Sequence, residues 1–204
     1  MIAVEVDENL ASELPKTIAR HAPDGQLELV VADALRVNVL PGAPTALVAN
    51  LPYNISVPVL LHFLETFPSI QKGLVMVQAE VAHRLAAGPG SKDYGAPSLK
   101  LAWYGSARLA GNVARSIFWP IPGVDSALVF FDTSANRDQS LRKLVFEAID
   151  QAFLQRRETL RQALAGYAGS AQLAEEMLLR AGVSPQARGE QLNIDQFIAI
   201  AKAK

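Results

Sequence analysis

The chain has 204 residues, of which half are apolar and 19% are charged, as in an ordinary globular protein. It contains no cysteine, which excludes disulfides and thiolate metal sites and fits a reducing cytoplasm. No apolar run reaches the roughly 18 residues that a membrane span needs, and the net charge of −1 gives no support for nucleic-acid binding. We therefore expect a cytoplasmic monomer without membrane or metal, in which any contact with a polyanion comes from local patches.

Up to residue 133, segments with strand-like and helix-like patterns alternate. Strands are expected at 2–6, 27–31, 45–49 and 73–78, and helices at 8–21, 58–67 and 80–87. Ser56 is a plausible N-cap for the second of these helices. An antiparallel pair is expected at 107–114 and 124–132, around the break at Pro120 to Gly123. This order favours an α/β fold with a mostly parallel sheet and helices on both faces.

From Ser134 onward the pattern is helical only. Helices are expected at 137–154, 157–164, 171–181 and 194–201. The sequence therefore predicts two domains, an α/β domain over residues 1–134 and a small all-α domain over residues 135–204. Basic residues outnumber acidic ones only in the second part, which weakly favours contact of that part with a polyanion.

Three of the expected strands end in polar residues, at Glu5, Asp33 and Asn50. Open parallel sheets bind ligands outside the carboxyl ends of their strands. A carboxylate at such a position suits the hydroxyls of a ribose, and another suits the exocyclic amine of an adenine. When Glu5 or Asp33 is considered alone, a solvated loop or a helix cap is the favoured interpretation.

The tetrapeptide Asn50-Leu51-Pro52-Tyr53 is more specific. The amine of adenine is a poor nucleophile, and a site activates it by accepting a hydrogen bond from each of its two N–H groups. Asn50 offers a side-chain carbonyl, and Leu51 offers a main-chain carbonyl whose conformation Pro52 restricts. Tyr53 offers a flat face on which an extruded base can stack. The alternative is an ordinary turn that leads into a helix.

Two further groups of residues are candidates for RNA contacts. Arg156, Arg157 and Arg161 lie at helical spacing and predict a phosphate clamp, with a solvated face paired to Glu158 as the alternative. Phe118 lies among prolines and either packs on the target base or supports a rigid loop. The three histidines have no partners at ligand spacing, so no metal site is expected.

These motifs and several other stretches resemble the ribosomal RNA adenine N6,N6-dimethyltransferases, and most closely the small-subunit branch of that family. The resemblance runs nearly end to end, and the stretches that carry it are Val4 to Asp7, Asp33-Ala34-Leu35, Asn50 to Ser56, Met76 to Leu85, Tyr94 to Ser98, Phe118 to Ser126, Ala152 to Arg161 and Arg188 to Leu192. It implies a Rossmann-like sheet that uses S-adenosylmethionine, and a small helical C-terminal domain.

The resemblance also implies a reaction and roles for individual residues. The enzyme would transfer methyl groups to N6 of two adjacent adenosines near the 3′ end of small-subunit rRNA, on a precursor of the small ribosomal subunit. Glu5 would hold the cofactor ribose, and Asp33 with Ala34 the cofactor adenine. Asn50 would serve both the cofactor and the target base, on which Tyr53 would stack.

The chain departs from the family pattern at its beginning. No G-x-G motif follows a strand, and the chain opens at what resembles the second strand of the family. A strand–helix unit of roughly 30 residues and a leader would be missing. Since the first strand is central in that fold, we expect a gap in the sheet, with weak cofactor binding and reduced stability.

This departure keeps a second hypothesis open, that of a non-catalytic RNA-binding or ribosome-assembly protein with an incomplete cofactor pocket. An adenine-N6 DNA methyltransferase is a third hypothesis. The helical C-terminal part and the Phe118 to Ser126 loop argue against it.

Overall fold

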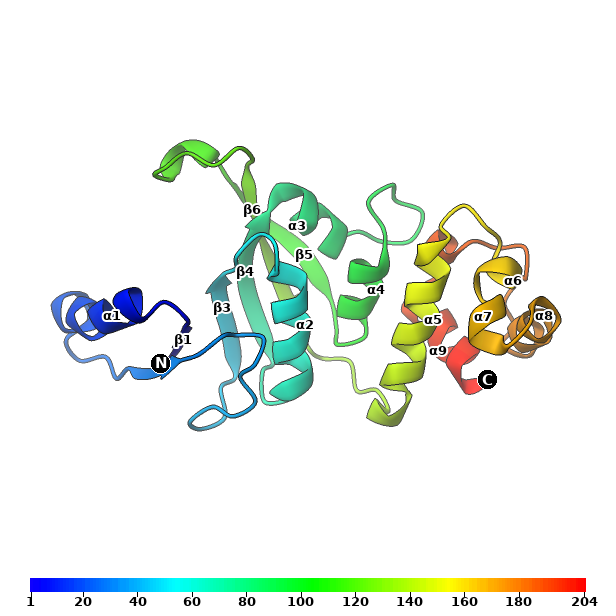
Figure 1. Ribbon diagram of the computed structural model, residues 1–204, viewed down its shortest axis with the longest axis horizontal. Helices are drawn as coiled ribbons and strands as arrows, with labels where there is room; N and C mark the ends of the chain where they lie inside the picture. The colour runs from blue at the N-terminus through cyan, green and yellow to red at the C-terminus, as the bar shows by residue number, and fades with distance from the viewer.

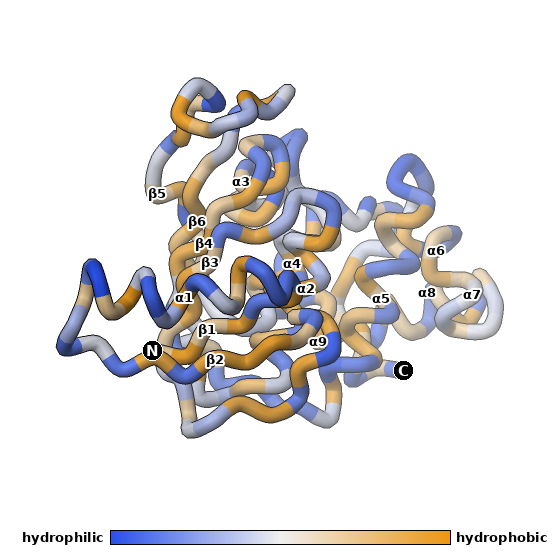
Figure 2. The backbone as a smooth tube through the Cα atoms, turned by 60° about the vertical axis from the view of Figure 1, so that its left-hand side comes forward, coloured by the Kyte–Doolittle hydropathy of each residue, from blue (hydrophilic) through white to orange (hydrophobic).

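The chain begins with a small strand–helix–strand unit in the computed structural model, which describes all 204 residues. The unit consists of β1 (Ile2–Glu5), α1 (Glu8–His21) and β2 (Glu28–Val31). The two strands pair in parallel, and Figure 2 shows them side by side. Asp7 caps α1 by accepting two backbone N–H groups of the first helical turn at 2.8 and 3.2 Å. The sequence-based expectation for this part of the chain is confirmed.

The larger sheet has four strands in the order β3-β4-β6-β5. Its members are β3 (Ala46–Asn50), β4 (Lys72–Gln78), β5 (Ala107–Val113) and β6 (Ser126–Asp132). β3 and β4 are parallel, whereas β6 is antiparallel to both of its neighbours. The expected hairpin of β5 and β6 is therefore confirmed, but the sheet is mixed and not mostly parallel.

Three helices accompany this sheet, namely α2 (Ser56–Thr66), α3 (Ala79–Leu85) and α4 (Ala96–Ala102). α4 was not expected from the sequence, where it directly follows the Gly- and Pro-containing segment that indicated a loop. Ser56 is the first residue of α2 and not its N-cap, since its hydroxyl donates to the Tyr53 carbonyl at 3.4 Å and caps no N–H group.

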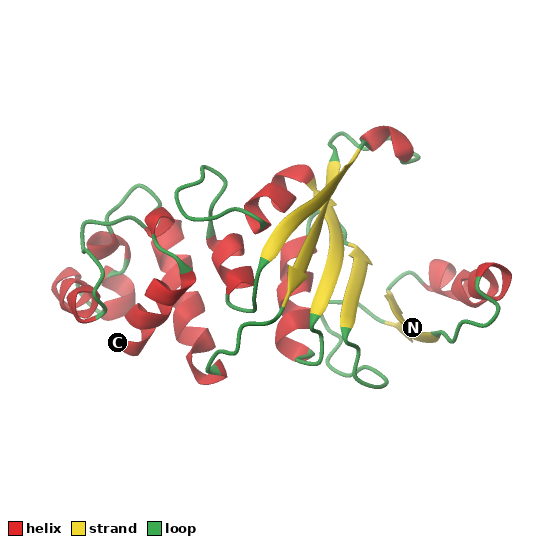
Figure 3. Ribbon diagram, turned by 180° about the vertical axis from the view of Figure 1, so that it is seen from behind, coloured by secondary structure: helices red, strands yellow, loops and turns green.

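Only one face of the four-stranded sheet is well covered. Along β4, Val75 and Val77 are fully buried, while Leu74 and Met76 on the other face are half-buried. Figure 1 shows α2 and α3 in front of this sheet, and Figure 3 shows the strands uncovered from behind. The expectation of helices on both faces is wrong for these four strands.

The β1–β2 pair and the four-stranded sheet are not joined by hydrogen bonds. β3 therefore has a free edge, and Val48 at its centre is 77% exposed. The small unit is connected to the rest through the chain that follows β2. There the buried Val37 offers its carbonyl to Nε2 of His62, on α2, at 2.8 Å. The gap in the sheet that the sequence predicted lies between β1 and β3.

The chain after residue 133 forms helices and no strands. They are α5 (Arg142–Leu154), α6 (Leu160–Ala163), α7 (Ala165–Ala168), α8 (Ala171–Arg180) and α9 (Ile194–Lys202), with single 3-10 turns at Gln139–Leu141 and Gly189–Gln191. The first expected helix starts five residues later than predicted, because Asp138 instead caps the 3-10 turn by accepting the Ser140 N–H at 3.0 Å.

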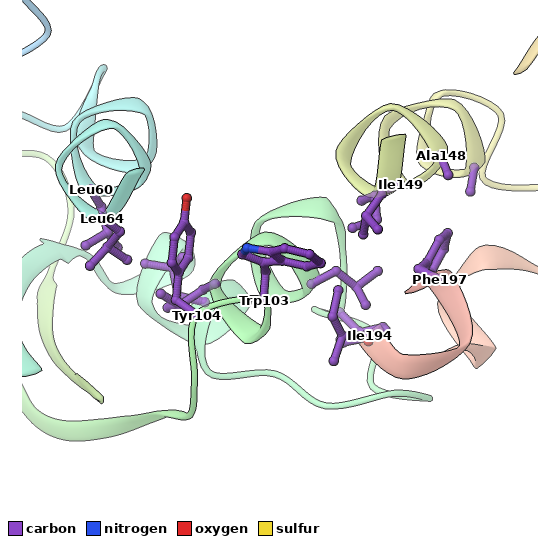
Figure 4. Packing of buried hydrophobic residues seen from close by; sticks show 14 of the residues in the cluster. Leu60, Leu64, Trp103, Tyr104, Ala148, Ile149, Ile194 and Phe197 are labelled. Atoms are coloured by element: carbon purple, nitrogen blue, oxygen red, sulfur yellow. The ribbon is translucent and has the colours of Figure 1, made fainter. Parts of the chain in front are cut away.

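One apolar core runs from the sheet into these helices. Trp103, which is 1% exposed, lies between the two parts and meets the Phe146 ring edge-on at a centroid distance of 6.2 Å. Figure 4 shows it between Tyr104 on one side and Ile149 on the other. The division proposed at residues 134 and 135 thus coincides with a change in the type of element and not with a break in the core.

Candidate active site

The tetrapeptide Asn50 to Tyr53 follows directly on β3 and turns the chain into α2. Asn50 is the last residue of the strand, in register with Met76. The next N–H, that of Leu51, still donates to the Met76 carbonyl at 3.1 Å, and the Leu51 side chain is buried. The strand end is therefore anchored in the sheet, which fixes the direction in which the tetrapeptide leaves it.

The two acceptors expected from the sequence are available at this strand end. The Asn50 side chain is exposed and makes no hydrogen bond within the protein. The Leu51 carbonyl accepts none either, because the turn is closed by the Pro52 carbonyl, to which Ile55 N–H donates at 3.2 Å. Two neighbouring carbonyl oxygens are thus free to accept hydrogen bonds from the two N–H groups of an amine.

Tyr53 is held by a residue far away in the sequence. Its hydroxyl is hydrogen-bonded at 2.6 Å to Oγ of Ser126, the buried first residue of β6. This bond fixes the half-buried ring at one end and leaves part of its surface accessible. Ser126 lies within a stretch that resembles the family, but no role could be assigned to it from the sequence alone, because the two residues are 73 positions apart.

Glu5 and Asp33 lie at the carboxyl ends of β1 and β2, as expected. One Glu5 carboxylate oxygen accepts the Asp7 N–H at 2.9 Å. One Asp33 oxygen accepts the Leu35 N–H at 2.9 Å, and the other lies 3.8 Å from Nε of Arg36. Both side chains therefore take part in local turns and keep acceptor capacity beyond them. Ala34 is half-buried against the apolar core.

The structure does not bring these carboxylates and Asn50 into one sheet. Glu5 and Asp33 belong to the β1–β2 pair, whereas Asn50 belongs to the four-stranded sheet on the other side of the gap. β1 and β3 each have one edge without a strand partner. The proposed cofactor residues are therefore divided between the β1–β2 pair and the four-stranded sheet, and the β1–β2 pair is the less buried of the two.

Phe118 lies in the long loop between β5 and β6, just after a 3-10 turn (Arg115–Ile117). It is half-buried. The loop is attached to the start of α3, where the Ala79 N–H donates to the Asp125 carbonyl at 2.9 Å. Since Asp125 directly precedes Ser126, the loop rises from the same edge of the sheet as Tyr53.

The phosphate clamp expected from helical spacing is wrong in its geometry. α5 ends at Leu154, so Arg156 and Arg157 lie in a turn and Arg161 lies on α6. Arg156 pairs with Glu190 at 3.0 Å, and Arg161 pairs with Glu175 at 2.7 Å. Only Arg157 of the three has no carboxylate partner, and it lines an open depression of about 590 Å³.

Comparison with known proteins identifies the family. The family model described as "Ribosomal RNA adenine dimethylase" matches residues 1–204. The chain belongs to this family. It is 57% identical over 210 residues to Ribosomal RNA small subunit methyltransferase A of Streptomyces coelicolor, with 99% of this chain and 72% of the relative covered. The corresponding protein of Rhodococcus erythropolis is 56% identical over 209 residues, with 98% and 70% covered.

Two solved structures share the fold. A dimethyladenosine transferase from Plasmodium falciparum has a TM-score of 0.79 at 21% identity, over 98% of this chain and 79% of that one. The 23S rRNA methyltransferase ErmE has a TM-score of 0.66 at 23% identity, over 99% and 80%. The resemblance stated from the sequence, the fold class and the enzyme class of an rRNA adenine dimethyltransferase are thereby confirmed.

As a member of this family, the chain is a methyltransferase, and the family uses S-adenosylmethionine as a class. The donor set is consistent with such a cofactor, since Glu5 and Asp33 both offer carboxylate oxygens at strand ends. No group of three or more His, Cys, Asp or Glu side chains in the structure is placed to hold a metal ion. None of the helices has the length and apolar character that a membrane span requires.

Proposed function

We propose that the chain methylates N6 of two adjacent adenosines near the 3′ end of small-subunit rRNA, during ribosome biogenesis. The observation that carries this proposal is the pair of free carbonyl oxygens on Asn50 and Leu51 beside the anchored ring of Tyr53. The name shared by the relatives, which specifies the small subunit, supports this choice of rRNA. We further propose that the chain acts in the cytoplasm, as a monomer, on a precursor of the small subunit.

In this proposal the tetrapeptide binds the target adenine and raises the nucleophilicity of its amine. The Asn50 and Leu51 carbonyls each accept a hydrogen bond from one N–H group of the amine. This favours a tetrahedral nitrogen whose lone pair is available for attack. Pro52 restricts the Leu51 backbone, and the Tyr53 ring stacks on the base. The methylated nitrogen is acidic and loses one proton to water. Rate acceleration then comes mainly from positioning.

Glu5, Asp33, Ala34 and Asn50 are the residues that we propose to hold S-adenosylmethionine, whose sulfonium supplies the methyl group. Glu5 would bind the ribose hydroxyls and Asp33 the adenine amine. Because these residues are divided between two groups of strands that no hydrogen bonds join, we expect weak binding. Calorimetric titration measures this directly, and a dissociation constant typical of a complete methyltransferase would contradict it.

The test of the function is methyl transfer at saturating S-adenosylmethionine to three acceptors: unmethylated small subunits, naked rRNA and duplex DNA. We expect transfer to the subunits, and a loss of about 100-fold in Asn50→Ala, by analogy with removal of one preorganised polar group from an active site. Asn112→Ala, at an exposed position on β5, is the matched control. Transfer to DNA alone, or equal rates for both variants, would refute the proposal.

A second function is favoured by one specific observation, the unpaired edges between β1 and β3. A chain that cannot hold the cofactor would serve only as an RNA-binding or ribosome-assembly protein. The two functions give opposite results in the calorimetric titration: saturable binding of S-adenosylmethionine supports the enzyme. Absence of binding by a folded chain that still binds small subunits supports the second function.

A further inference from the structure

The loop between β5 and β6, residues 114–125, carries the most exposed tryptophan of the chain. Figures 1 and 3 show this loop extending beyond the end of the sheet. Trp119 is 93% exposed, Ile117 70% and Ile121 60%. We call these three side chains the hairpin tip. Large apolar side chains gathered on one protruding loop are typical of a contact surface, and tryptophan is enriched at the energetic centres of such surfaces.

The backbone under the hairpin tip is held in place. Oδ1 of Asp125 accepts the Arg115 N–H at 3.1 Å, and the Gly123 carbonyl accepts Nη1–H of Arg115 at 3.3 Å. The Phe118 N–H donates to the Arg115 carbonyl at 3.2 Å, which closes the 3-10 turn. Pro120 and Pro122 remove further backbone freedom. The exposed rings are therefore presented in a defined position, so that little conformational entropy is lost on binding.

The tip is connected to the target-base site by a short chain of contacts. Asp125 at the end of the loop is followed by Ser126, which is bonded to the Tyr53 hydroxyl. Within the loop, Phe118 is half-buried, whereas its neighbour Trp119 is turned to solvent. Of these two neighbours, only Trp119 is fully open to a partner.

The charges on the loop favour a nucleic acid as the occupant. Arg115 forms no ion pair with a carboxylate, so its guanidinium is available to a phosphate. The single acidic residue of the loop, Asp125, is engaged with a backbone N–H. Figure 2 shows the alternation of apolar and polar residues along this loop. An aromatic ring beside an unpaired cation is the combination that binds single-stranded RNA, through base stacking and phosphate contact.

We infer that Trp119 is a stacking platform for an unpaired base of the rRNA that lies outside the target pocket, with Arg115 on the adjoining phosphate. This inference rests on the rRNA methyltransferase activity and adds a second base contact to it. The platform holds the RNA while Asn50 and Tyr53 engage the target adenine, so it acts on RNA affinity and not on the chemical step.

A double-mutant cycle between protein and RNA tests the inference. The probes are a short hairpin RNA whose loop carries two adjacent adenosines, and copies of it in which one unpaired base at a time is replaced by an abasic linker. We expect Trp119→Ala to weaken binding of the intact hairpin about 10-fold. One of the abasic copies should bind the native chain about 10-fold more weakly than the intact hairpin does. Trp119→Ala should bind this copy and the intact hairpin with the same affinity. Trp119→Phe should retain most of the affinity, and Val39→Ala, at another exposed apolar position, should retain all of it.

Tryptophan fluorescence gives an independent readout, because the only other tryptophan, Trp103, is 1% exposed. Hairpin RNA should protect Trp119 from acrylamide quenching, whereas heparin, a polyanion without bases, should not. Equal affinities of the native chain and Trp119→Ala, or an abasic penalty that persists in this variant, would overturn the inference. Asn50→Ala separates the two proposals, since it should lower methyl transfer about 100-fold and leave the response of Trp119 unchanged.

Discussion

The part of the chain from Val37 onward and the β1–β2 unit differ sharply in burial, although both carry residues of the proposed site. The apolar core comprises 36 buried residues, and all of them lie at or after Val37. In the first 36 residues of the chain, only Ala11 is buried. The target-base residues Asn50 to Tyr53 are thus built on the well-packed part, and the cofactor residues Glu5 and Asp33 on the sparsely packed part. The part of the chain that binds the base and the part that binds the cofactor therefore need not be equally stable.

The largest expected effect concerns the packed part. Trp103→Ala removes a fully buried ring at the junction of sheet and helices, and should lower the free energy of unfolding by about 3–5 kcal/mol. Trp119→Ala, the matched control, should change it by less than about 0.5 kcal/mol, because that ring is exposed. Chemical denaturation measures both. Similar values for the two variants would remove one side of the comparison.

Trp103→Phe sharpens this test. The indole Nε1 is buried without a hydrogen-bond partner, so its loss removes an unsatisfied polar group along with part of the ring. This variant should therefore cost clearly less than Trp103→Ala.

The second prediction concerns the β1–β2 unit itself. Its amides should open with a free energy well below that of global unfolding, because few apolar contacts hold it. Hydrogen exchange should show at least roughly 100-fold less protection in β1 and β2 than in β4 and β6, which form the centre of the large sheet. Addition of S-adenosylmethionine should reduce the difference if Glu5 and Asp33 bind it. Equal protection in the absence of ligand would mean that the gap between the sheets does not weaken the unit.

A smaller effect is expected at the contact between Tyr53 and Ser126. Ser126→Ala leaves the tyrosine hydroxyl without its partner and frees the ring, so methyl transfer should fall about 10-fold, the equivalent of one neutral hydrogen bond. The loss should appear in kcat at saturating RNA, and Ser98→Ala, another buried serine, is the control for general damage to the fold. An unchanged kcat would mean that the tyrosine is positioned by packing alone.

Local patterns in the sequence were sufficient for most of the elements. α1 begins and ends at the expected residues because Asp7 and the apolar spacing are local signals. The gap between the sheets followed from the resemblance to the family, whose central first strand and glycine motif have no counterpart in this chain. The direction of the hairpin of β5 and β6 followed from the break at its prolines.

What sequence reasoning missed depends on contacts between distant residues. The arginine cluster failed as a helical clamp because Arg156 also donates to the Lys92 carbonyl at 3.0 Å, a contact that belongs to the turn after α5. The Tyr53–Ser126 bond and the half-exposed face of the large sheet have the same origin, since both depend on how the strands are ordered and covered. No pattern within a single segment contains that information.

The smallest expected effect is the contribution of Asp132, at the end of β6, to stability in acid. Hydrogen bonds from the hydroxyls of Ser106 and Ser134 lower the pKa of this carboxyl from 3.8 to about 2. The folded state therefore favours the carboxylate, which stabilises the protein above pH 3.8, and this contribution is lost as the pH falls toward 2. Asp132→Asn should remove the contribution of this residue to the pH dependence of stability in this window, and should leave the pH dependence near neutral pH unchanged. Because the contact joins β6 to the chain just before β5, Asp132→Asn should leave the exchange of β1 and β2 unaffected. A parallel loss of protection in both regions would show that the two parts of the molecule are coupled more tightly than their packing indicates.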